Sequence, residues 1–101
     1  MIIDEQITYK YADQLLQGRC SNKRKLRHNT WLYRYEDHFE IEYYYTTILY
    51  IYKDYYEFNT GGWWSVTTKQ RMNTYAGVDI YSEKGIWIFK GVKFYNGMKG
   101  Y

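Results

Sequence analysis

The residues best suited to chemistry lie in one block, NTGGWWSVTTKQRMN, at positions 59–73. Its glycine pair, Gly61 and Gly62, can adopt a positive φ and let the backbone approach a ligand closely. Hydroxyl groups and cations follow at a spacing that fits the first turns of a helix. These are Thr67, Thr68, Lys69 and Arg71. The block therefore has the composition of a phosphate-binding corner, although G-x-x-x-x-G-K-[ST] does not occur and nucleotide hydrolysis is not expected.

The same block also fits a purely structural role, which is the interpretation we favour. In that role the glycine pair forms an ordinary turn and Trp63 anchors the core. Thr67 then caps a helix, and Asn73 bonds to nearby backbone.

A basic run lies between residues 18 and 28, which contain no acid. We expect a flexible loop there that attracts nucleic-acid phosphates or an acidic protein surface. A solvated loop without a partner is the alternative. The cations of the run are Arg19, Lys23, Arg24, Lys25 and Arg27, and Lys69 and Arg71 extend the predicted nucleic-acid-binding set.

The middle of the chain is acidic, with six carboxylates and one lysine between residues 36 and 57. Glu40, Glu42 and Asp54 predict a partner-binding patch whose charges imitate nucleic-acid phosphate. Tyr44 and Trp64 join this set as exposed aromatics that form an interface or stack on bases. The alternative is that the acids form a solvent-exposed strand face without a partner and that the rings fill the core.

Catalysis has little support, and we expect no enzymatic activity. His28 and His38 lie in or beside loops, and motifs such as G-x-S-x-G or H-E-x-x-H are absent. The single cysteine, Cys20, has no adjacent base or resolving cysteine, so we do not expect it to be reactive. Too few ligands are present for a zinc site, and we predict neither a metal nor a cofactor.

Two helices are expected to hold these residues. Ile7, Tyr11 and Leu15 recur at a spacing of four before Gly18, which predicts an amphipathic helix over residues 5–17. Ser65, Thr67 and Thr68 are candidate N-caps, and the helix-forming residues between them and Gly77 predict a short helix over residues 67–75.

The rest of the chain has the pattern of strands. TWLYRY at 30–35 and the alternating segment at 39–52 predict two strands, with a polar turn at 36–38. Alternation places Tyr43 and Tyr45 on one face of the second strand. A turn at 53–54, a strand at 55–59 and a hairpin over 78–89 follow, and the tail at 91–101 is expected to be irregular. The hairpin should bury either Ile86 and Ile88 or Trp87 and Phe89.

The predicted fold class is α+β: an antiparallel sheet of about five strands, an N-terminal helix and a short helix after the Gly-Gly turn. At 101 residues the chain is expected to form a single domain, 1–101. Aromatic residues make up 23% of it and proline is absent, which excludes disordered and collagenous classes. No apolar run is long enough for a membrane span, so we expect no membrane contact and a cytoplasmic location in a bacterial host cell.

Several segments together resemble a family of small proteins encoded by phages and other mobile elements. The central block at 59–73 carries most of the resemblance, and Tyr44 stands where that family often has histidine. Trp64 and Ser65 replace a common Arg-Thr pair, and Asn96 replaces Asp. The resemblance implies a role in infection or gene transfer rather than a mechanism. Its other segments are HNTWLYR at 28–34, YYTTILYI at 44–51, GIWIF at 85–89 and FYNGM at 94–98.

Three functions remain open at this point. The one we prefer is a small protein that binds and inhibits a host defence component, such as a CRISPR nuclease complex. Its partner is then a host defence protein or a ribonucleoprotein complex. The second is a nucleic-acid-binding accessory module, whose affinity should fall steeply with salt. The third is a structural or assembly protein of the phage particle, with a homodimer formed through strand edges as one form.

Overall fold

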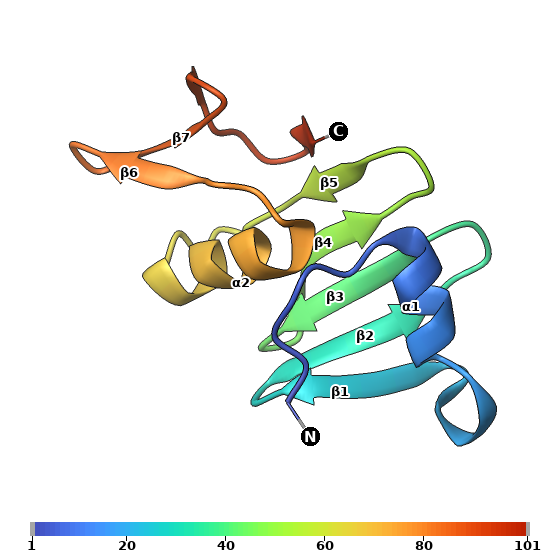
Figure 1. Ribbon diagram of the computed structural model, residues 1–101. Coiled ribbons are helices and arrows are strands. Elements are labelled where there is room, and N and C mark those ends of the chain that lie inside the picture. Colours follow the sequence, from blue (N-terminus) through green and yellow to red (C-terminus); the bar gives the residue numbers. More distant parts are fainter. Residues whose placement is uncertain (1, 101) are drawn as a thin grey trace.

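The computed structural model describes residues 2–100, and the side chain of Cys20 lies outside the described part (Figure 1). The helices are α1 (Tyr9–Leu15) and α2 (Val66–Ala76), with a short 3-10 helix η1 (Gly18–Cys20). The strands are β1 (Lys23–Arg27), β2 (Thr30–Arg34), β3 (Phe39–Tyr43), β4 (Thr46–Ile51), β5 (Tyr56–Phe58), β6 (Tyr81–Glu83), β7 (Ile86–Phe89), β8 (Val92–Lys93) and β9 (Lys99–Gly100).

Two antiparallel sheets make up the β structure. The larger has six strands in the order β1-β2-β3-β4-β5-β9, and the smaller has the order β6-β7-β8. The α+β class is therefore confirmed, with a helix before the sheet and a second helix after the Gly-Gly turn. The six-stranded sheet is one strand larger than expected, and the hairpin at 78–89 belongs to the separate small sheet.

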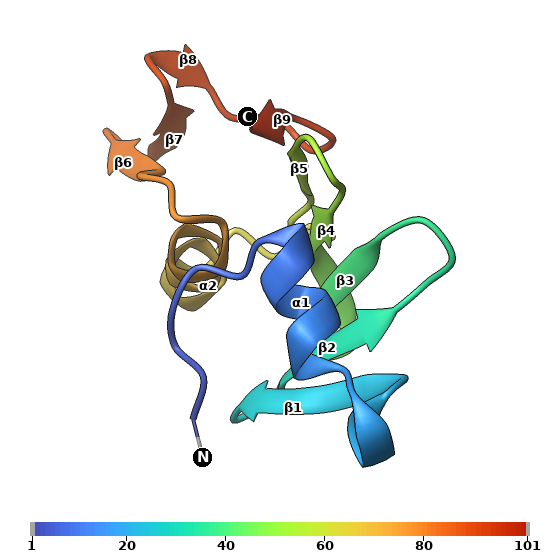
Figure 2. The ribbon, with the colours of Figure 1, turned by 45° about the vertical axis from the view of Figure 1, so that its right-hand side comes forward.

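Both helices lie on the same face of the larger sheet (Figure 2). Beneath them, one row of partners runs straight across β2 to β5, and every member is fully buried. Residues one position along each strand point to the other face, over which Figures 1 and 2 show no element of residues 2–100. The buried row is Leu32, Ile41, Leu49 and Phe58.

The basic run is a strand rather than the predicted loop. Residues of β1 pair with β2 in antiparallel register, and Leu26 is completely buried. Leu26 is the one side chain of β1 that is fully buried, and its burial stabilises the pairing of this strand. The cations before it alternate between the two faces of the sheet. Lys23 and Lys25 face away from the core, and Arg24 lies opposite the buried Leu32.

The first helix is shorter than the predicted 5–17. It begins at Tyr9, where the Thr8 hydroxyl caps it by accepting from the Tyr11 amide. The preceding residues run extended, with the amides of Ile3 and Ile7 donating to carbonyls of β1 and α2. Ile7 is fully buried in this extended segment. Tertiary burial therefore decides the conformation of residues 2–8 over their helical periodicity.

The segment predicted as one strand over 39–52 is a hairpin. Tyr44 and Tyr45 form a two-residue turn between β3 and β4, with φ of 50° and 64°. Tyr45 is therefore not on the buried face: its side chain is 95% exposed. Tight turns of this type normally use Asn-Gly, so no turn signal in the sequence marked the break.

The small sheet is joined to the large one through aromatic rings. The Phe58 ring packs edge-on against Phe89 and Phe94, at centroid distances of 5.4 and 6.1 Å. Trp87 and Phe89 are buried, which confirms the alternation predicted for the hairpin. The tail is more regular than predicted, because it contains β8 and β9, and β9 pairs with β5.

Candidate functional site: the open face of the sheet and the hollow at its end

The uncovered face of the six-stranded sheet is lined by aromatic and charged side chains, and we call it the open face. None of the residues in its two rows is fully buried. Cations stand on the edge strands, and acids and rings alternate between them. One row across the strands is Lys23, Tyr33, Glu40, Tyr50, Glu57 and Lys99; the other is Lys25, Trp31, Glu42 and Thr47.

The three predicted acids do not form one patch. Glu40 is bound on both sides, because one carboxylate oxygen lies 2.8 Å from Nε2 of His38 and the other accepts from Thr47 at 2.9 Å. Glu42 lies on the open face beside the Tyr44–Tyr45 turn. Asp54 is exposed in the β4–β5 turn, at the opposite end of the strands.

The two predicted aromatics have different environments. Tyr44 is 57% exposed on its turn. Trp64 is 49% exposed, but its ring packs edge-on against Trp87 and Phe94 at 5.0 and 5.7 Å. Trp64 therefore also covers the core of the small sheet, whereas Tyr44 is presented to solvent.

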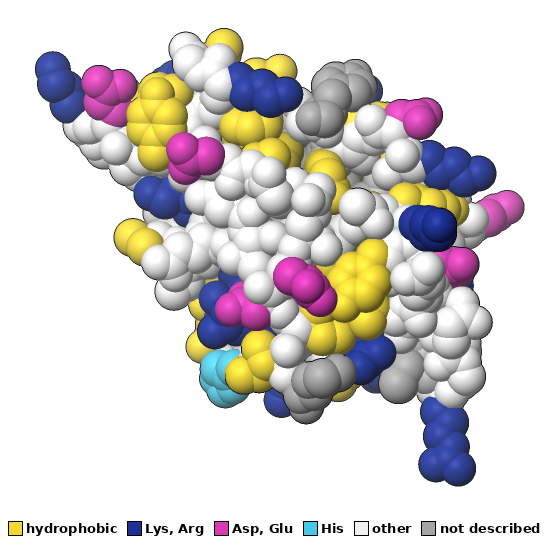
Figure 3. Space-filling model, viewed as in Figure 1, with side chains coloured by type: hydrophobic (Ala, Val, Ile, Leu, Met, Phe, Trp, Pro, Cys, Tyr) yellow, Lys and Arg dark blue, Asp and Glu magenta, His cyan; other side chains and the backbone are white. Residues whose placement is uncertain are grey.

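The predicted nucleic-acid-binding cations point in several directions. Only Lys23 and Lys25 lie on the open face. Arg24 donates to the Leu15 carbonyl on the helix side, and Arg19 is exposed in η1. Lys69 donates to the Ser82 hydroxyl at 2.7 Å. Figure 3 shows that Lys and Arg side chains on the helix-bearing face are scattered among acids rather than gathered.

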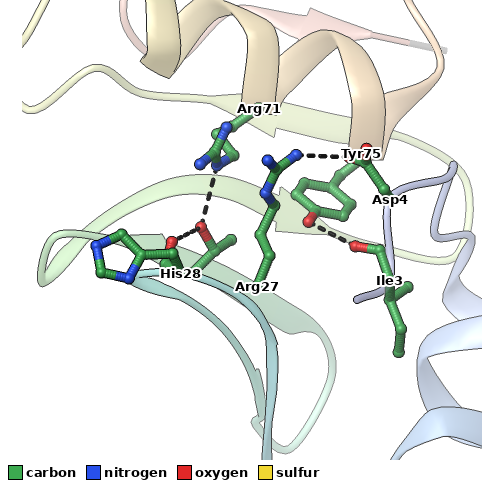
Figure 4. A network of polar contacts seen from close by, with 7 residues as sticks. Ile3, Asp4, Arg27, His28, Arg71 and Tyr75 are labelled. Carbon is green, nitrogen blue, oxygen red and sulfur yellow. Dashed lines mark hydrogen bonds and ion pairs between the residues drawn. The ribbon is translucent and has the colours of Figure 1, made fainter. Parts of the chain in front are cut away.

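Arg27 and Arg71 are held in a polar network between β1, β2 and α2 (Figure 4). Arg27 pairs with Asp4 at 2.9 Å, and Nε of Arg71 donates to the Thr30 hydroxyl at 3.1 Å. Beside them the Tyr75 hydroxyl donates to the Ile3 carbonyl at 2.7 Å. Burial raises the pKa of Tyr75 to about 12, so this donor stays protonated. The network fastens the N-terminal segment to the core.

His38 is the centre of a polar and aromatic cluster at one end of the open face. Its ring is stacked against Tyr35 and Tyr52, at centroid distances of 5.2 and 4.9 Å. Its Nδ1 lies 2.7 Å from a carboxylate oxygen of Asp37, and Nε2 faces Glu40. Burial alone lowers the His38 pKa, but hydrogen bonds to the two carboxylates outweigh it and raise the pKa above 6.5.

Stability is therefore expected to depend on the charge of His38. A pKa raised by folding means that protonated His38 stabilises the fold below pH 6.5, and that this contribution is lost as pH rises through the folded pKa. Urea unfolding between pH 6 and 9 should show stability falling with pH in the wild type and a flatter profile in His38→Gln. His28→Gln, at the other histidine, is the matched control. An unchanged slope in His38→Gln would contradict this assignment.

A hollow of about 360 Å³ opens where β3, β4 and the start of α2 meet. We call it the first hollow. Ile48, Thr60 and Thr68 are buried at its base, and the rings of Tyr43, Tyr44 and Trp63 stand around it. Five serine and threonine side chains and no charged residue contribute to the lining.

A second hollow of about 220 Å³ lies on the open face, whereas the first lies on the helix-bearing face, where Tyr43 donates to Thr67 of α2. Trp31, Tyr33 and Tyr45 contribute its aromatic walls, with Lys23 and Glu42 beside them. Tyr44, in the turn that joins β3 to β4, lines both hollows.

The loop that carries Trp63 is fixed by hydrogen bonds. The Thr60 amide donates to the Asn96 side chain at 2.8 Å, and the Trp63 amide donates to the Thr60 carbonyl at 3.0 Å. Gly61 has a φ of 62°, and a Cβ there would overlap Cγ2 of Thr46. The loop therefore packs against β4 closely enough to form one wall of the first hollow, and Trp63 is 67% exposed on a constrained backbone.

The residues of the phosphate-binding corner considered for the central block are divided between the first hollow, which Thr67 and Thr68 line, and contacts elsewhere. Gly61 and Gly62 have the expected positive φ, but Lys69 and Arg71 bind Ser82 and Thr30 and do not line the first hollow. The structural alternative is correct for Asn73, whose side chain exchanges hydrogen bonds with the Ile80 backbone. It is wrong for two other residues. Trp63 is exposed rather than a core anchor, and Ser65, not Thr67, is the N-cap of α2.

The sequence reasoning missed four aromatic residues of this region. Trp31 and Tyr33 could have been found, because Leu32 between them is the residue of that strand expected to face the core. Tyr45 and Trp63 carried no such signal, since the turn and the loop that expose them depend on contacts with distant residues. All four line one of the two hollows.

The model of the Kyanoviridae Gp96 protein family matches residues 7–100, which is nearly the whole chain. The chain belongs to this family of phage proteins. No curated protein and no solved structure matches it.

Two further features of this Gp96-family chain bear on its site. Among residues 2–100, no three His, Cys, Asp or Glu side chains gather in a geometry that could hold a metal ion. Neither of the two helices there is long and apolar enough to cross a membrane.

Proposed function

We propose that this phage protein is a non-catalytic accessory protein that binds a host protein through the open face of its sheet. The partner we favour is a component of bacterial defence, such as a CRISPR nuclease complex, which the protein inhibits in the host cytoplasm. The observation that carries the proposal is a wide strand face of tyrosine, tryptophan and mixed charges that no other element of residues 2–100 covers.

The charges of that face favour a protein partner over nucleic acid. Glu40, Glu42 and Glu57 lie on the inner strands, and the lysines stand on the edge strands β1 and β9. A phosphate backbone laid across the sheet would meet these carboxylates at its centre, which opposes binding. Protein interfaces accept both signs and are enriched in tyrosine and tryptophan.

The version in which acids imitate phosphate is the weaker form of the proposal. Both carboxylate oxygens of Glu40 are hydrogen-bonded within the chain, to His38 and Thr47. Asp54 lies at the far end of the strands from Glu42. Aromatic side chains are therefore expected to contribute more of the affinity than the carboxylates.

Tyr33 and Tyr50 offer the sharpest test, because they flank Glu40 in the centre of the open face. We expect the tagged wild-type protein to retain a defined host protein from nuclease-treated lysate, read by mass spectrometry. The double variant Tyr33→Ser/Tyr50→Ser should reduce binding about tenfold or more. Tyr81→Ser/Tyr95→Ser, at exposed tyrosines elsewhere, should bind as the wild type does.

Two outcomes would reject binding through this face. One is that nuclease treatment removes everything the protein captures, and the other is that both double variants bind equally well. Inhibition is measured separately, as plasmid transformation into a host whose CRISPR system targets that plasmid. Wild-type protein should restore transformation and Tyr33→Ser/Tyr50→Ser should not. If neither restores it while binding persists, the inhibitor role fails and the binding role remains.

A further inference from the structure

The outer edge of β1 carries backbone groups that no other strand of residues 2–100 pairs. β1 is the last strand of the six-stranded sheet, with β2 beside it on one side. The Arg34 amide donates to the carbonyl of Asn22, directly opposite, and such hydrogen-bonded pairs alternate along an antiparallel ladder. The N–H and C=O groups of Lys23 and Lys25 therefore point away from β2.

A hollow of about 440 Å³ lies along this edge, and we call it the edge hollow. Its lining consists of the consecutive residues 24–28 and Ile2; among residues 2–100 it includes no acid and no residue of β2. Because a hollow over either face of the sheet would also touch β2, this one lies beside β1. Its cations are Arg24, Lys25 and Arg27, so the edge offers both unpaired backbone groups and positive charge.

The N-terminal segment of the chain already binds the end of this strand in an extended conformation. The Ile3 amide donates to the Leu26 carbonyl at 2.8 Å. The neighbouring Asp4 pairs with Arg27 at 2.9 Å (Figure 4). An acidic extended segment thus fits the end of β1 through one backbone hydrogen bond and one ion pair. The same two interactions are open to another segment farther along the strand.

The charges of the edge select its occupant. A second copy of β1 is disfavoured, because antiparallel pairing of two such strands would place cations opposite cations. A strand with acidic side chains would instead face Lys23 and Lys25 on the open face and Arg24 on the other face. A nucleic-acid strand is the poorer fit, because phosphate oxygens accept hydrogen bonds from the amides but donate none to the outward carbonyl groups.

We propose that the outer edge of β1 binds an extended acidic segment of a partner protein, which adds a strand to the sheet. Backbone hydrogen bonds to Lys23 and Lys25 hold the segment, and its side chains at every second position lie against these two lysines. This inference goes beyond the proposed function. It concerns backbone pairing at the edge of the sheet and does not involve the tyrosines of the open face.

The probe is a blocked peptide of about eight residues in which glutamate and valine alternate, titrated into the isotope-labelled full chain and followed by NMR. We expect the Lys23 and Lys25 amide signals to shift and their hydrogen exchange to slow. A peptide with proline in place of each valine keeps the charge but loses half of the backbone donors. It should bind about tenfold more weakly or worse, because it cannot form a paired strand.

Charge reversal in the protein tests the same edge. Lys23→Glu/Lys25→Glu should weaken the glutamate–valine peptide about tenfold or more, because like charges would then lie opposite each other. Lys84→Glu/Lys93→Glu, at exposed lysines around the small sheet, is the matched control. It changes the net charge equally and should bind the peptide as the wild type does.

The inference is overturned if millimolar peptide leaves both lysine amides unchanged, or if the glutamate–proline peptide binds as tightly as the glutamate–valine peptide. It is also overturned if an oligothymidine binds the edge more tightly than the peptide. Slow exchange of both amides without peptide, together with a dimer in sedimentation, would assign the edge to a second copy of the chain and overturn it as well.

Discussion

Replacing Phe58 with alanine is expected to lower the free energy of unfolding by about 3–5 kcal/mol, the usual cost of removing a buried phenylalanine ring. The side chain is completely buried, and its ring contacts both Phe89 and Phe94. Phe58 also exchanges backbone hydrogen bonds with the tail, donating to Met98 and accepting from Gly97. Urea denaturation followed by circular dichroism measures the loss.

This prediction has a specific structural consequence. Because the Phe58 ring joins the two sheets, the cavity left by alanine should loosen the small sheet more than β1 to β4. Amide exchange in β7 should therefore accelerate more than exchange in β2. Phe58→Leu keeps most of the volume and should cost clearly less. Equal losses in both variants, or equal acceleration in both strands, would contradict the role assigned to this ring.

Replacing Gly61 with alanine is expected to cost about 1–3 kcal/mol for the positive φ, with a further penalty for overlap with Thr46. Thermal unfolding measures the loss.

Gly62 provides the matched control for this substitution. It also has a positive φ, 90°, but a Cβ there meets open space. Gly62→Ala should therefore show only the backbone strain. Thr46→Ala in the Gly61→Ala background should recover the part of the loss that comes from overlap. If Thr46→Ala recovers none of the loss in the Gly61→Ala background, the close approach of the loop to β4 contributes nothing.

The family match identifies the class of protein, and the open face identifies the surface proposed to bind a partner. The match to residues 7–100 makes the chain a phage protein. The open face supports binding, and the separation of Glu42 from Asp54 argues against an acidic imitation of nucleic acid. Arg24, Arg27, Lys69 and Arg71 make contacts within the chain and do not share the open face with Lys23 and Lys25.

Local patterns predicted the elements whose conformation depends on near neighbours. The Ser65–Gly77 segment has a cap, helix formers and a left-handed end, and α2 forms there within one residue of the predicted bounds. The β-type patterns of TWLYRY and IWIF likewise identified strands, and the structure decided which face of each is buried. These signals are strong because the periodicity of a helix or strand is written into adjacent residues.

Long-range contacts decided the remainder. Ile7 is buried in an extended segment because the amides of Ile3 and Ile7 donate to the carbonyls of Leu26 and Tyr75. Burial of Leu26 likewise stabilises the basic run as an edge strand. The Tyr44–Tyr45 turn has no turn-forming residue, so pairing of β3 with β4 must impose it.

The amino-acid sequence by itself determined the α+β class, the second helix and the aromatic character of the chain. Tertiary structure alone decided which aromatic rings are exposed and which are buried. The aromatic residues that line the hollows are of the same types as those in the core. The register of the strands places Tyr43, Tyr44 and Tyr45 there, and the packing of Gly61 on Thr46 places Trp63. The physical reason is that a ring gains similar free energy from the core or from a partner, so its residue type does not record which it contacts.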